Sequence, residues 1–553
     1  MAFTRRTALI AGGSFMLSGW RGLLAGNRGI VPELILHNAN IWTVDPASPT
    51  AQALAIANGR ILAVGSNDFV LGLAVAQTRK VDIGKHRITP GFIDAHAHPA
   101  ASGLQYVRDV DCGLSSIEAI KAALRDRSQK VPAGAWVKGF SYDDGKTPRP
   151  LTLADLDDAV PDHPVVVAHR GGHSLFVNTL AMKAVGYDRN TPSPPGGLIE
   201  KDAAGNLTGK VADDARLSFE KLSAQLATRT DWRDAAMLIS KRAAARGITS
   251  VCDAMGDADI LQGYRDAATA GPPQTRVYCC ISYQKIQPFL DAGISTGFGD
   301  EAVRVGPVKL WVDGSISERT AWVSEPYVGT NFHGVPVGTR EDLYELASKP
   351  HQAGWQLATH ANGDLAIDEV LSVYEQIQRE MPRRDPRYRL EHCSVVTPEI
   401  IARIRALGAV PIPFSAYVSF HGDVMHFYGE QRTRHMFAMR DFLNAGIPAA
   451  ASSDFGASPM DPPLWLQSQV TRSDPQGHVW GANQKISVAE AVRCGTLNGA
   501  YSMFAENEKG SLQPGRLADL VVWDRDMFAV DPSELAHISP QRTMIGGKWA
   551  YET

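Results

Sequence analysis

The sequence predicts an α/β protein built around a parallel (β/α) barrel of the TIM type. Three observations support this fold. Between about residues 89 and 509, short apolar segments alternate with helical stretches such as 230–246. Reactive side chains stand at the ends of those apolar segments, where barrels of this type carry their active residues. Both ends of the chain contain short β-like segments and turns instead.

The N-terminal β segments lie between residue 33 and about residue 88. They are residues 34–36, 41–44, 53–56 and 60–64, and an Ala-Asn-Gly turn at 57–59 joins the last two. The C-terminal part has two further segments, 518–524 and 543–549. These segments predict β structure outside the barrel.

The most informative stretch is TPGFIDAHAHP at residues 89–99, an apolar strand that ends in His-x-His. Side chains alternate along a strand with period two, so His96 and His98 point the same way and can reach one cation. Taken alone, the pair is explained equally well by histidines whose ring nitrogens bind backbone carbonyls. The rest of the chain favours the metal.

Four further apolar runs end in candidate ligands, which are Lys309, His360, His392 and Asp454. Each has an ordinary structural explanation. A lone lysine in a strand is usually salt-bridged, a histidine at a strand end is usually hydrogen-bonded in the core, and an Asp after Ser-Ser usually caps a helix. Those explanations do not predict that all four occur together at successive strand ends.

The set His-x-His, Lys, His, His and Asp resembles the ligand set of the amidohydrolase superfamily of metal-dependent hydrolases. More narrowly, the chain resembles the amidohydrolase-3 branch, which includes N-substituted formamide deformylase. Further matching motifs are GHSLFVN at 172–178, PGGLI at 195–199 with NLTG at 206–209, DGSISERTA at 313–321 and KGSLQPGRLADLVV at 509–522. The resemblance covers roughly residues 33 to 548, and no ligand of the set is missing.

The resemblance implies a centre of one or two ions of zinc or a similar divalent metal. His96 and His98 would hold one ion and His360 and His392 the other, with a mononuclear variant left open. Lys309 cannot bind a cation as an ammonium, but burial lowers the pKa of a lysine and its free amine can take up carbon dioxide. An N-carboxylated Lys309 bridging two ions is what the resemblance implies.

Asp454 is the predicted catalytic residue as well as a metal ligand. It would take the proton of the attacking water and pass it to the leaving nitrogen. The chemistry therefore needs Asp454 to face both the ligand histidines and the substrate.

The resemblance also implies a domain organisation around a (β/α)8 barrel. Residues 31–88 and 510–553 would join into one small β-sandwich, and residues 89–509 would form the barrel. Residues 111–221 are longer than one strand–helix unit needs, so we expect a lobe inserted after the first barrel strand that closes over the pocket.

Side chains of this lobe and of later loops are the candidate substrate contacts: His173, Asn178, Tyr142, Arg319, Trp322, Tyr417 and His421. His173 and Asn178 lie in a motif of the family, yet a structural role fits them equally well. The run 414–426 is rich in aromatic residues. It favours an apolar or aromatic substrate group, although such clusters are more often core.

Composition agrees with a large soluble enzyme, and the resemblance implies a small-molecule substrate. The net charge of −4 and the pI of about 6.5 provide no basic field for nucleic acid or an anionic membrane. The six cysteines lack Cys-x-x-Cys spacing and indicate buried thiols. The oligomeric state stays open, with a homo-oligomer among the alternatives.

Residues 1–30 begin with a Thr-Arg-Arg sequence and a short, mildly apolar stretch, which resembles a twin-arginine export signal. This predicts a periplasmic or secreted protein. A cytoplasmic protein with an N-terminal extension is the alternative, because no Ala-x-Ala cleavage site is obvious. The stretch is too short for stable membrane insertion.

The function that this pattern predicts is metal-dependent cleavage of an amide-like C–N bond in a small N-substituted substrate. An esterase, lactonase or deaminase on the same centre is the alternative, because the pocket decides which substrate the activated water attacks. An exported, non-catalytic binding or regulatory protein is a further alternative. Such a protein would have no physical need for a buried lysine and an Asp aimed at one point.

Overall fold

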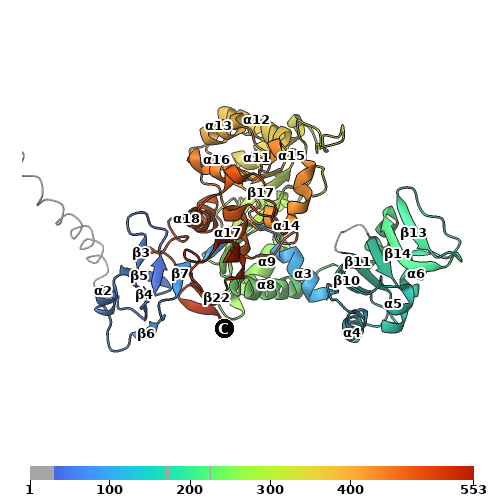
Figure 1. The fold of residues 1–553 in the computed structure, drawn as a ribbon, viewed down its shortest axis with the longest axis horizontal. Helices are drawn as coiled ribbons and strands as arrows, with labels where there is room; N and C mark the ends of the chain where they lie inside the picture. The colour runs from blue at the N-terminus through green and yellow to red at the C-terminus, as the bar shows by residue number, and fades with distance from the viewer. Residues whose placement is uncertain (1–29, 170–173, 225) are drawn as a thin grey trace, which may run out of the picture.

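The computed structural model describes residues 30–169, 174–224 and 226–553. Figure 1 shows three parts: a central barrel, a β-rich part formed by both chain ends, and a lobe beyond helix α3 (Pro99–Arg108). The predicted export signal, apart from its last residue, and His173 lie outside the described residues.

The barrel consists of seven parallel strands in the order β20-β19-β18-β17-β16-β15-β8. They are β8 (Phe92–Ala97), β15 (Ile248–Gly256), β16 (Arg276–Ser282), β17 (Val303–Trp311), β18 (Leu357–Ala361), β19 (Arg389–His392) and β20 (Val410–Ile412). The chain at 447–455 fills the gap between β20 and β8. The Ala450 amide donates to Pro411 O at 3.1 Å, and the Ala95 amide donates to Ala451 O at 3.1 Å. The predicted TIM-like α/β fold is therefore confirmed.

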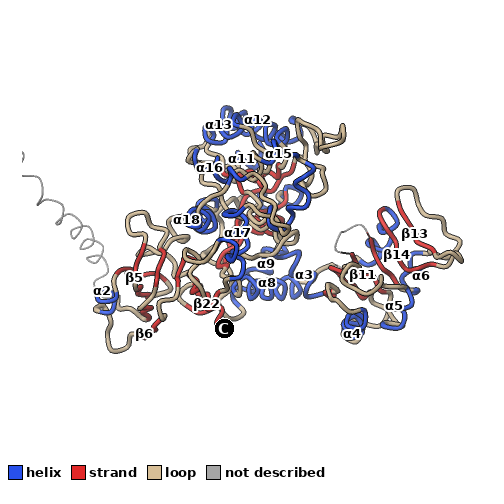
Figure 2. Tube along the Cα trace, viewed as in Figure 1, coloured by secondary structure: helices blue, strands red, loops and turns tan. Residues whose placement is uncertain are grey.

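Helices cover the outside of this barrel (Figure 2). They include α8 (Arg229–Ala244), α9 (Ala258–Thr269), α11 (Arg340–Gln352), α12 (Asp364–Glu380), α13 (Pro398–Leu407), α17 (Pro462–Thr471) and α18 (Val488–Arg493). α12 shows why they pack there: Ile367, Val370, Leu371 and Tyr374 recur at helical spacing and are buried. Helix α8 begins at a capping box between Thr228 and Asp231, which satisfies amides of its first turn.

Both chain ends contribute to one six-stranded sheet, in the order β23-β22-β21-β7-β2-β3. Its strands are β2 (Asn40–Trp42), β3 (Thr50–Ala51), β7 (Arg87–Pro90), β21 (Leu520–Trp523), β22 (Pro540–Ile545) and β23 (Lys548–Glu552). A four-stranded sheet lies beside it, made of β1 (Leu34–His37), β4 (Ala53–Ala57), β5 (Arg60–Gly65) and β6 (Arg79–Asp82). One apolar cluster, which includes Leu36, Ile56 and Val522, draws on both sheets.

Two turns decide how these β segments are divided. Asn58 and Gly59 have φ of 51° and 72°, so the predicted turn between β4 and β5 is a tight hairpin. The segment 543–549, expected as one β segment, is instead a hairpin. Gly546 and Gly547 have φ of 56° and 77° and turn the chain between β22 and β23.

The lobe contains a second six-stranded sheet, in the order β13-β14-β12-β11-β10-β9. Its strands are β9 (Val110–Asp111), β10 (Val137–Tyr142), β11 (Val165–His169), β12 (Ser174–Val177), β13 (Gly197–Lys201) and β14 (Leu207–Asp213). The connections between its strands include the helices α4 (Ile117–Ser128), α5 (Leu153–Ala159) and α6 (Thr179–Val185). The sheet has apolar clusters of its own and lies to the side of the barrel in Figure 1.

Among the described residues, no helix combines the length and apolar character that crossing a membrane requires.

Candidate metal centre

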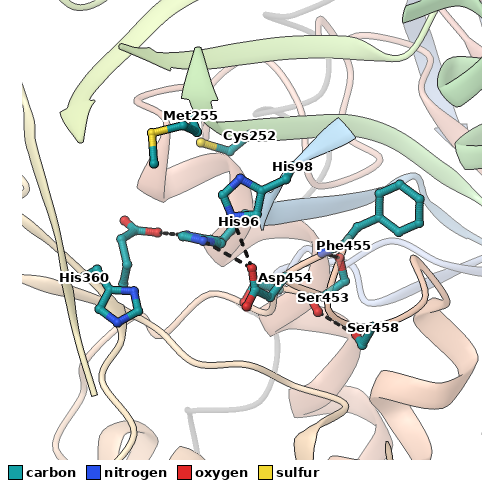
Figure 3. Close-up of polar contacts among 12 residues, drawn as sticks. His96, His98, Cys252, Met255, His360, Ser453, Asp454, Phe455 and Ser458 are labelled. Carbon is teal, nitrogen blue, oxygen red and sulfur yellow. Dashed lines mark hydrogen bonds and ion pairs between the residues drawn. The ribbon is translucent and has the colours of Figure 1, made fainter. Parts of the chain in front are cut away.

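His96, His98 and Asp454 meet at the end of β8 (Figure 3). Asp454 Oδ1 lies 3.6 Å from His96 Nε2 and 3.4 Å from His98 Nε2. The backbone sets this position, because the Asp454 amide donates to His96 O at 2.8 Å and Asp454 has a left-handed φ of 54°. Asp94 helps, since it accepts the Ser453 amide at 2.9 Å and holds the preceding residue against β8.

The other two predicted histidines continue this cluster. The ring of His392 lies 4.7 Å from that of His96 and 4.5 Å from that of His360, measured between centroids. His360 Nε2 is 3.0 Å from Gly314 O and 3.1 Å from Asn362 Nδ2. Lys309 is buried on β17 between the strands that carry the histidines, and its charge acts on His96, His360 and His392. The structure thus brings together all six predicted ligands.

His392 needs an unusual backbone to join this cluster. It follows Glu391 directly, so plain strand alternation would send the two side chains to opposite faces. His392 and Cys393 instead have φ of 68° and 45°, and the strand ends there. Such left-handed backbone at non-glycine residues costs energy and is typical of functional sites.

Glu391 and Arg389 are a part of the centre that the sequence reasoning missed. His96 Nδ1 donates a hydrogen bond to Glu391 Oε2. Arg389 Nε donates to Glu391 Oε1 at 2.7 Å, and its guanidinium also donates to Ala95 O at 2.6 Å on the opposite strand β8. The signal was available: Arg389 and Glu391 are two residues apart in a strand, so they share one face, and buried charges at that spacing indicate a pair.

Burial lowers the pKa of His96, His360 and His392 and so favours their neutral form, which is the form that binds a metal. Burial, followed by the charge of Lys309, lowers the pKa of His96 to about 4, and the same two causes lower that of His360 to about 4. Burial also lowers the pKa of Lys309, against the opposing charge of Glu391. Burial alone would raise the pKa of Asp454, but the hydrogen bond from His98 and the charges of His392 and His96 hold it well below its ordinary value.

These residues fit a divalent cation. Within residues 30–169, 174–224 and 226–553, His96 Nε2 is a buried nitrogen without a hydrogen-bond partner, and it faces Asp454. Because Glu391 accepts from Nδ1, the lone pair of the ring is on Nε2, the atom without a partner. Imidazole nitrogens and a carboxylate oxygen are typical ligands of zinc.

Four predicted substrate contacts follow barrel strands: Arg319 and Trp322 lie in the loop after β17, and Tyr417 and His421 lie in α14 (Tyr417–His421) after β20. Tyr417 Oη is 2.7 Å from Ser317 Oγ, and its ring stacks on Phe437. The ring of His421 lies 5.1 Å from that of Tyr417. The guanidinium of Arg319 covers the ring of Phe427, and the backbone amide of Trp322 donates to Asp313.

The structure does not bring Tyr142 and Asn178 to the histidines. Tyr142 lies in the core of the lobe, where its hydroxyl accepts the Leu151 amide at 2.9 Å. Asn178 caps helix α6, accepts the Ala181 amide and donates to Val160 O and His163 O. Their polar atoms are therefore already paired within the lobe. His173 lies outside the described residues.

Two other carboxylates near the centre are held by backbone amides. Asp313 accepts from Asn362, Gly363 and Trp322 at 2.8–3.0 Å, which fixes the loop after His360. Asp364 accepts the amide of Ser324 at 2.9 Å. Asp454 is the carboxylate that faces His96 and His98.

A cleft of about 580 Å³ opens beside the centre and is lined by His98 and Asp454. This volume is typical of small-molecule sites. The cleft continues along α3 toward Lys138 of the lobe, so Asp454 is reached from outside the barrel.

A family model described as Amidohydrolase family, of the amidohydrolase-3 type, matches residues 81–551. The chain belongs to the amidohydrolase-3 branch of the amidohydrolase family. Among the relatives of this amidohydrolase, the N-substituted formamide deformylase of Arthrobacter pascens is 28% identical over 540 residues, which cover 94% of this chain and 98% of the relative. The LONG AFTER FAR-RED 3 protein of Arabidopsis thaliana is 29% identical over 544 residues, covering 95% and 92%.

Solved structures agree on the fold of this amidohydrolase. A metal-dependent hydrolase of uncharacterised role from Pyrococcus horikoshii OT3 superposes with a TM-score of 0.74 at 22% identity, covering 90% of this chain and 99% of that one. That protein is named a metal-dependent hydrolase, and the histidines and carboxylate brought together in this chain are side chains of the kind that hold a metal.

Proposed function

We propose that this amidohydrolase cleaves an amide-like C–N bond of a small N-substituted substrate by means of a metal-activated water. The observation that carries the proposal is the convergence of four histidine rings and Asp454 at one mouth of the barrel, beside an open cleft. The relative named N-substituted formamide deformylase supports the choice of a C–N bond.

We propose that His96, His98 and Asp454 hold one divalent ion, and that His360 and His392 hold a second. Such an ion lowers the pKa of a water molecule and polarises a carbonyl group. The chain itself orients the ligands. Glu391 fixes the tautomer of His96, and a hydrogen bond from His360 Nε2 to Gly314 O would leave His360 Nδ1 for the ion. Zinc is the metal that this donor set favours.

Lys309 is the proposed bridging ligand. Its buried amine, with a lowered pKa, is the nucleophilic form of the side chain. The nitrogen forms a bond to the carbon of carbon dioxide and releases one proton, which yields a carbamate with two anionic oxygens. The charge of this residue would change from zero in the free amine to −1 in the carbamate, which would attract cations to the space between the histidines.

Asp454 is the proposed proton carrier. Its carboxylate is ionised, because its pKa is held well below the ordinary value, and it faces the cleft that His98 also lines. It accepts a proton from the attacking water and returns it to the leaving nitrogen, so one residue acts as base and then as acid.

The same centre would serve an esterase, a lactonase or a deaminase, because all of them use activated water. We also propose that the lobe closes over the cleft when substrate binds, and that residues 1–30 direct the protein to the periplasm or outside the cell. A non-catalytic role would leave the buried Lys309 and the strained backbone of His392 and Asp454 without purpose.

A hydrolysis screen of the zinc-loaded protein tests the proposal. We expect turnover of one or more N-formyl, N-acyl or carbamate compounds, at higher kcat/KM than for esters of the same acyl group. Asp454→Asn serves as the matched inactive control. Hydrolysis of the esters alone would favour the alternative, and equal rates for wild type and Asp454→Asn would contradict the proposed centre.

A further inference from the structure

The cleft beside Asp454 runs along one face of helix α3. Ala101, Leu104 and Gln105 line it, and the last two lie on the same face as Ala101 because they follow it by three and four residues. Its far end is formed by Arg108, Asp109 and Lys138. Lys138 comes from β10 in the lobe, which Figure 1 shows beyond the end of α3.

The far end of the cleft carries more positive than negative charge. Lys138, Arg127 and Arg108 all act on the one carboxylate of Asp109. Arg108 also lies 3.6 Å from Asp231. Among the described residues that line this end of the cleft, Arg108 and Lys138 are the cations and Asp109 is the carboxylate, in a protein whose net charge is −4. This local excess differs in sign from the protein as a whole.

The ammonium group of Lys138 is close to a carboxylate but does not form a hydrogen bond with it. Its Nζ is 3.9 Å from Asp109 Oδ2, which is beyond hydrogen-bond distance, and its side chain is 36% exposed. Lys130, elsewhere on the lobe, shows the contrast: its Nζ is 2.6 Å from Asp126 Oδ2 and it does not line the cleft. An ammonium carries three N–H donors, so Lys138 can bind an anion that enters the cleft.

We propose that the end of the cleft around Lys138 is a binding subsite for a carboxylate at the far end of an elongated substrate. The inference rests on the proposed function, because the scissile bond of that substrate would lie at the metal centre. Helix α3, along which the cleft runs, has 10 residues and spans about 15 Å, which gives the approximate length of the cleft in the arrangement that the structure shows. Substrates with an apolar middle and an anionic tail fit this length and charge.

The test uses straight-chain hydroxamic acids, whose hydroxamate group chelates a divalent metal. One series ends in a carboxylate and a matched series ends in a methyl group, and affinity for the zinc-loaded protein is measured by calorimetry. At the chain length that spans the cleft, we expect the carboxylate to bind about tenfold more tightly at low ionic strength. The preference should shrink as salt is added.

Variants test whether Lys138 causes this preference for the carboxylate series. Lys138→Gln should abolish it and Lys138→Arg should retain it, while Lys130→Gln should leave it unchanged. Equal affinities of the two series for the wild type at every chain length would overturn the subsite. An equal loss of preference in Lys130→Gln would overturn it as well, because a general charge effect would then explain the result.

A second measurement separates this inference from the proposed function. Octanoate is titrated into the metal-free protein and followed by NMR, with Lys138→Gln as the comparison. Weaker octanoate binding in Lys138→Gln supports the subsite even if no hydroxamate binds, which would be the failure of the metal centre. Identical octanoate titrations of wild type and Lys138→Gln contradict the subsite whatever the hydroxamates do.

Discussion

His96 donates a hydrogen bond from Nδ1 to Glu391, and this contact leaves its buried Nε2 facing Asp454 without a partner. One carboxylate therefore fixes which ring nitrogen is available to a cation. Arg389 in turn holds Glu391 through Nε at 2.7 Å and reaches across the barrel to Ala95 O. The position of the first ligand is therefore set by two side chains of β19, one of which is anchored to the backbone of β8.

The first prediction concerns Glu391. Glu391→Gln should lower zinc affinity by about 10–100-fold, because the neutral amide orients His96 less firmly and makes its ring a weaker donor. Competition with a chromophoric chelator measures the affinity. Asp519→Asn is the matched control. Asp519 also forms a buried ion pair, with Arg276 Nε 2.7 Å from Asp519 Oδ2, but this pair is not part of the histidine cluster. Both variants should lose stability, but only Glu391→Gln should lose affinity.

The second prediction concerns Lys309. Lys309→Ala should lose activity and recover part of it when short-chain carboxylic acids are added, because they supply bridging oxygens in the vacated space. Lys309→Arg should stay inactive, because a guanidinium remains protonated and cannot form a carbamate. Steady-state rates with and without the acid measure the rescue.

Isotope-labelled bicarbonate provides an independent readout for Lys309. The wild type should show a carbamate carbon resonance that is absent from Lys309→Ala. Full activity of Lys309→Arg, or the same resonance in the alanine variant, would show that Lys309 is not the bridging group.

The third prediction is a pH dependence of the metal-free protein. His96 and His360 have pKa values of about 4 when folded, against an ordinary 6.5, so between these values the unfolded chain binds protons that the folded chain does not. The free energy of unfolding should therefore be highest above pH 6.5 and fall as pH drops toward 4. Urea unfolding in the presence of a chelator measures it. His96→Gln should give a shallower fall, and an unchanged slope would contradict the assigned burial effect.

Much of the centre could be predicted from the sequence because strand ends and residue types are local properties. The sequence predicts His96, His98, Lys309, His360, His392 and Asp454 in this way, since each follows or ends an apolar run. The meeting of these side chains depends on the barrel closing through 447–455, which carries too few ladder bonds to be a regular strand. That closure is a long-range property.

Other features could not be predicted, because they depend on contacts between distant parts of the chain. The partner of Glu391 is His96, which lies 295 residues earlier in the sequence. Tyr142 and Asn178 were expected near the substrate, but their polar groups pair with backbone inside the lobe. The residue type at a motif position does not reveal whether the polar atoms of its side chain already form hydrogen bonds with nearby backbone groups.

The fourth prediction tests the central claim, that Asp454 carries the proton in a metal-dependent hydrolysis. Asp454→Asn should lower kcat by about 10²–10⁴-fold, or more because a metal ligand is also altered, while binding of a substrate analogue weakens less. The measurement is kcat and kcat/KM across pH for wild type and Asp454→Asn, with metal content checked in both. We predict that the variant loses turnover together with the acid limb of the wild-type profile. Turnover at the wild-type rate with an unchanged acid limb would contradict the account.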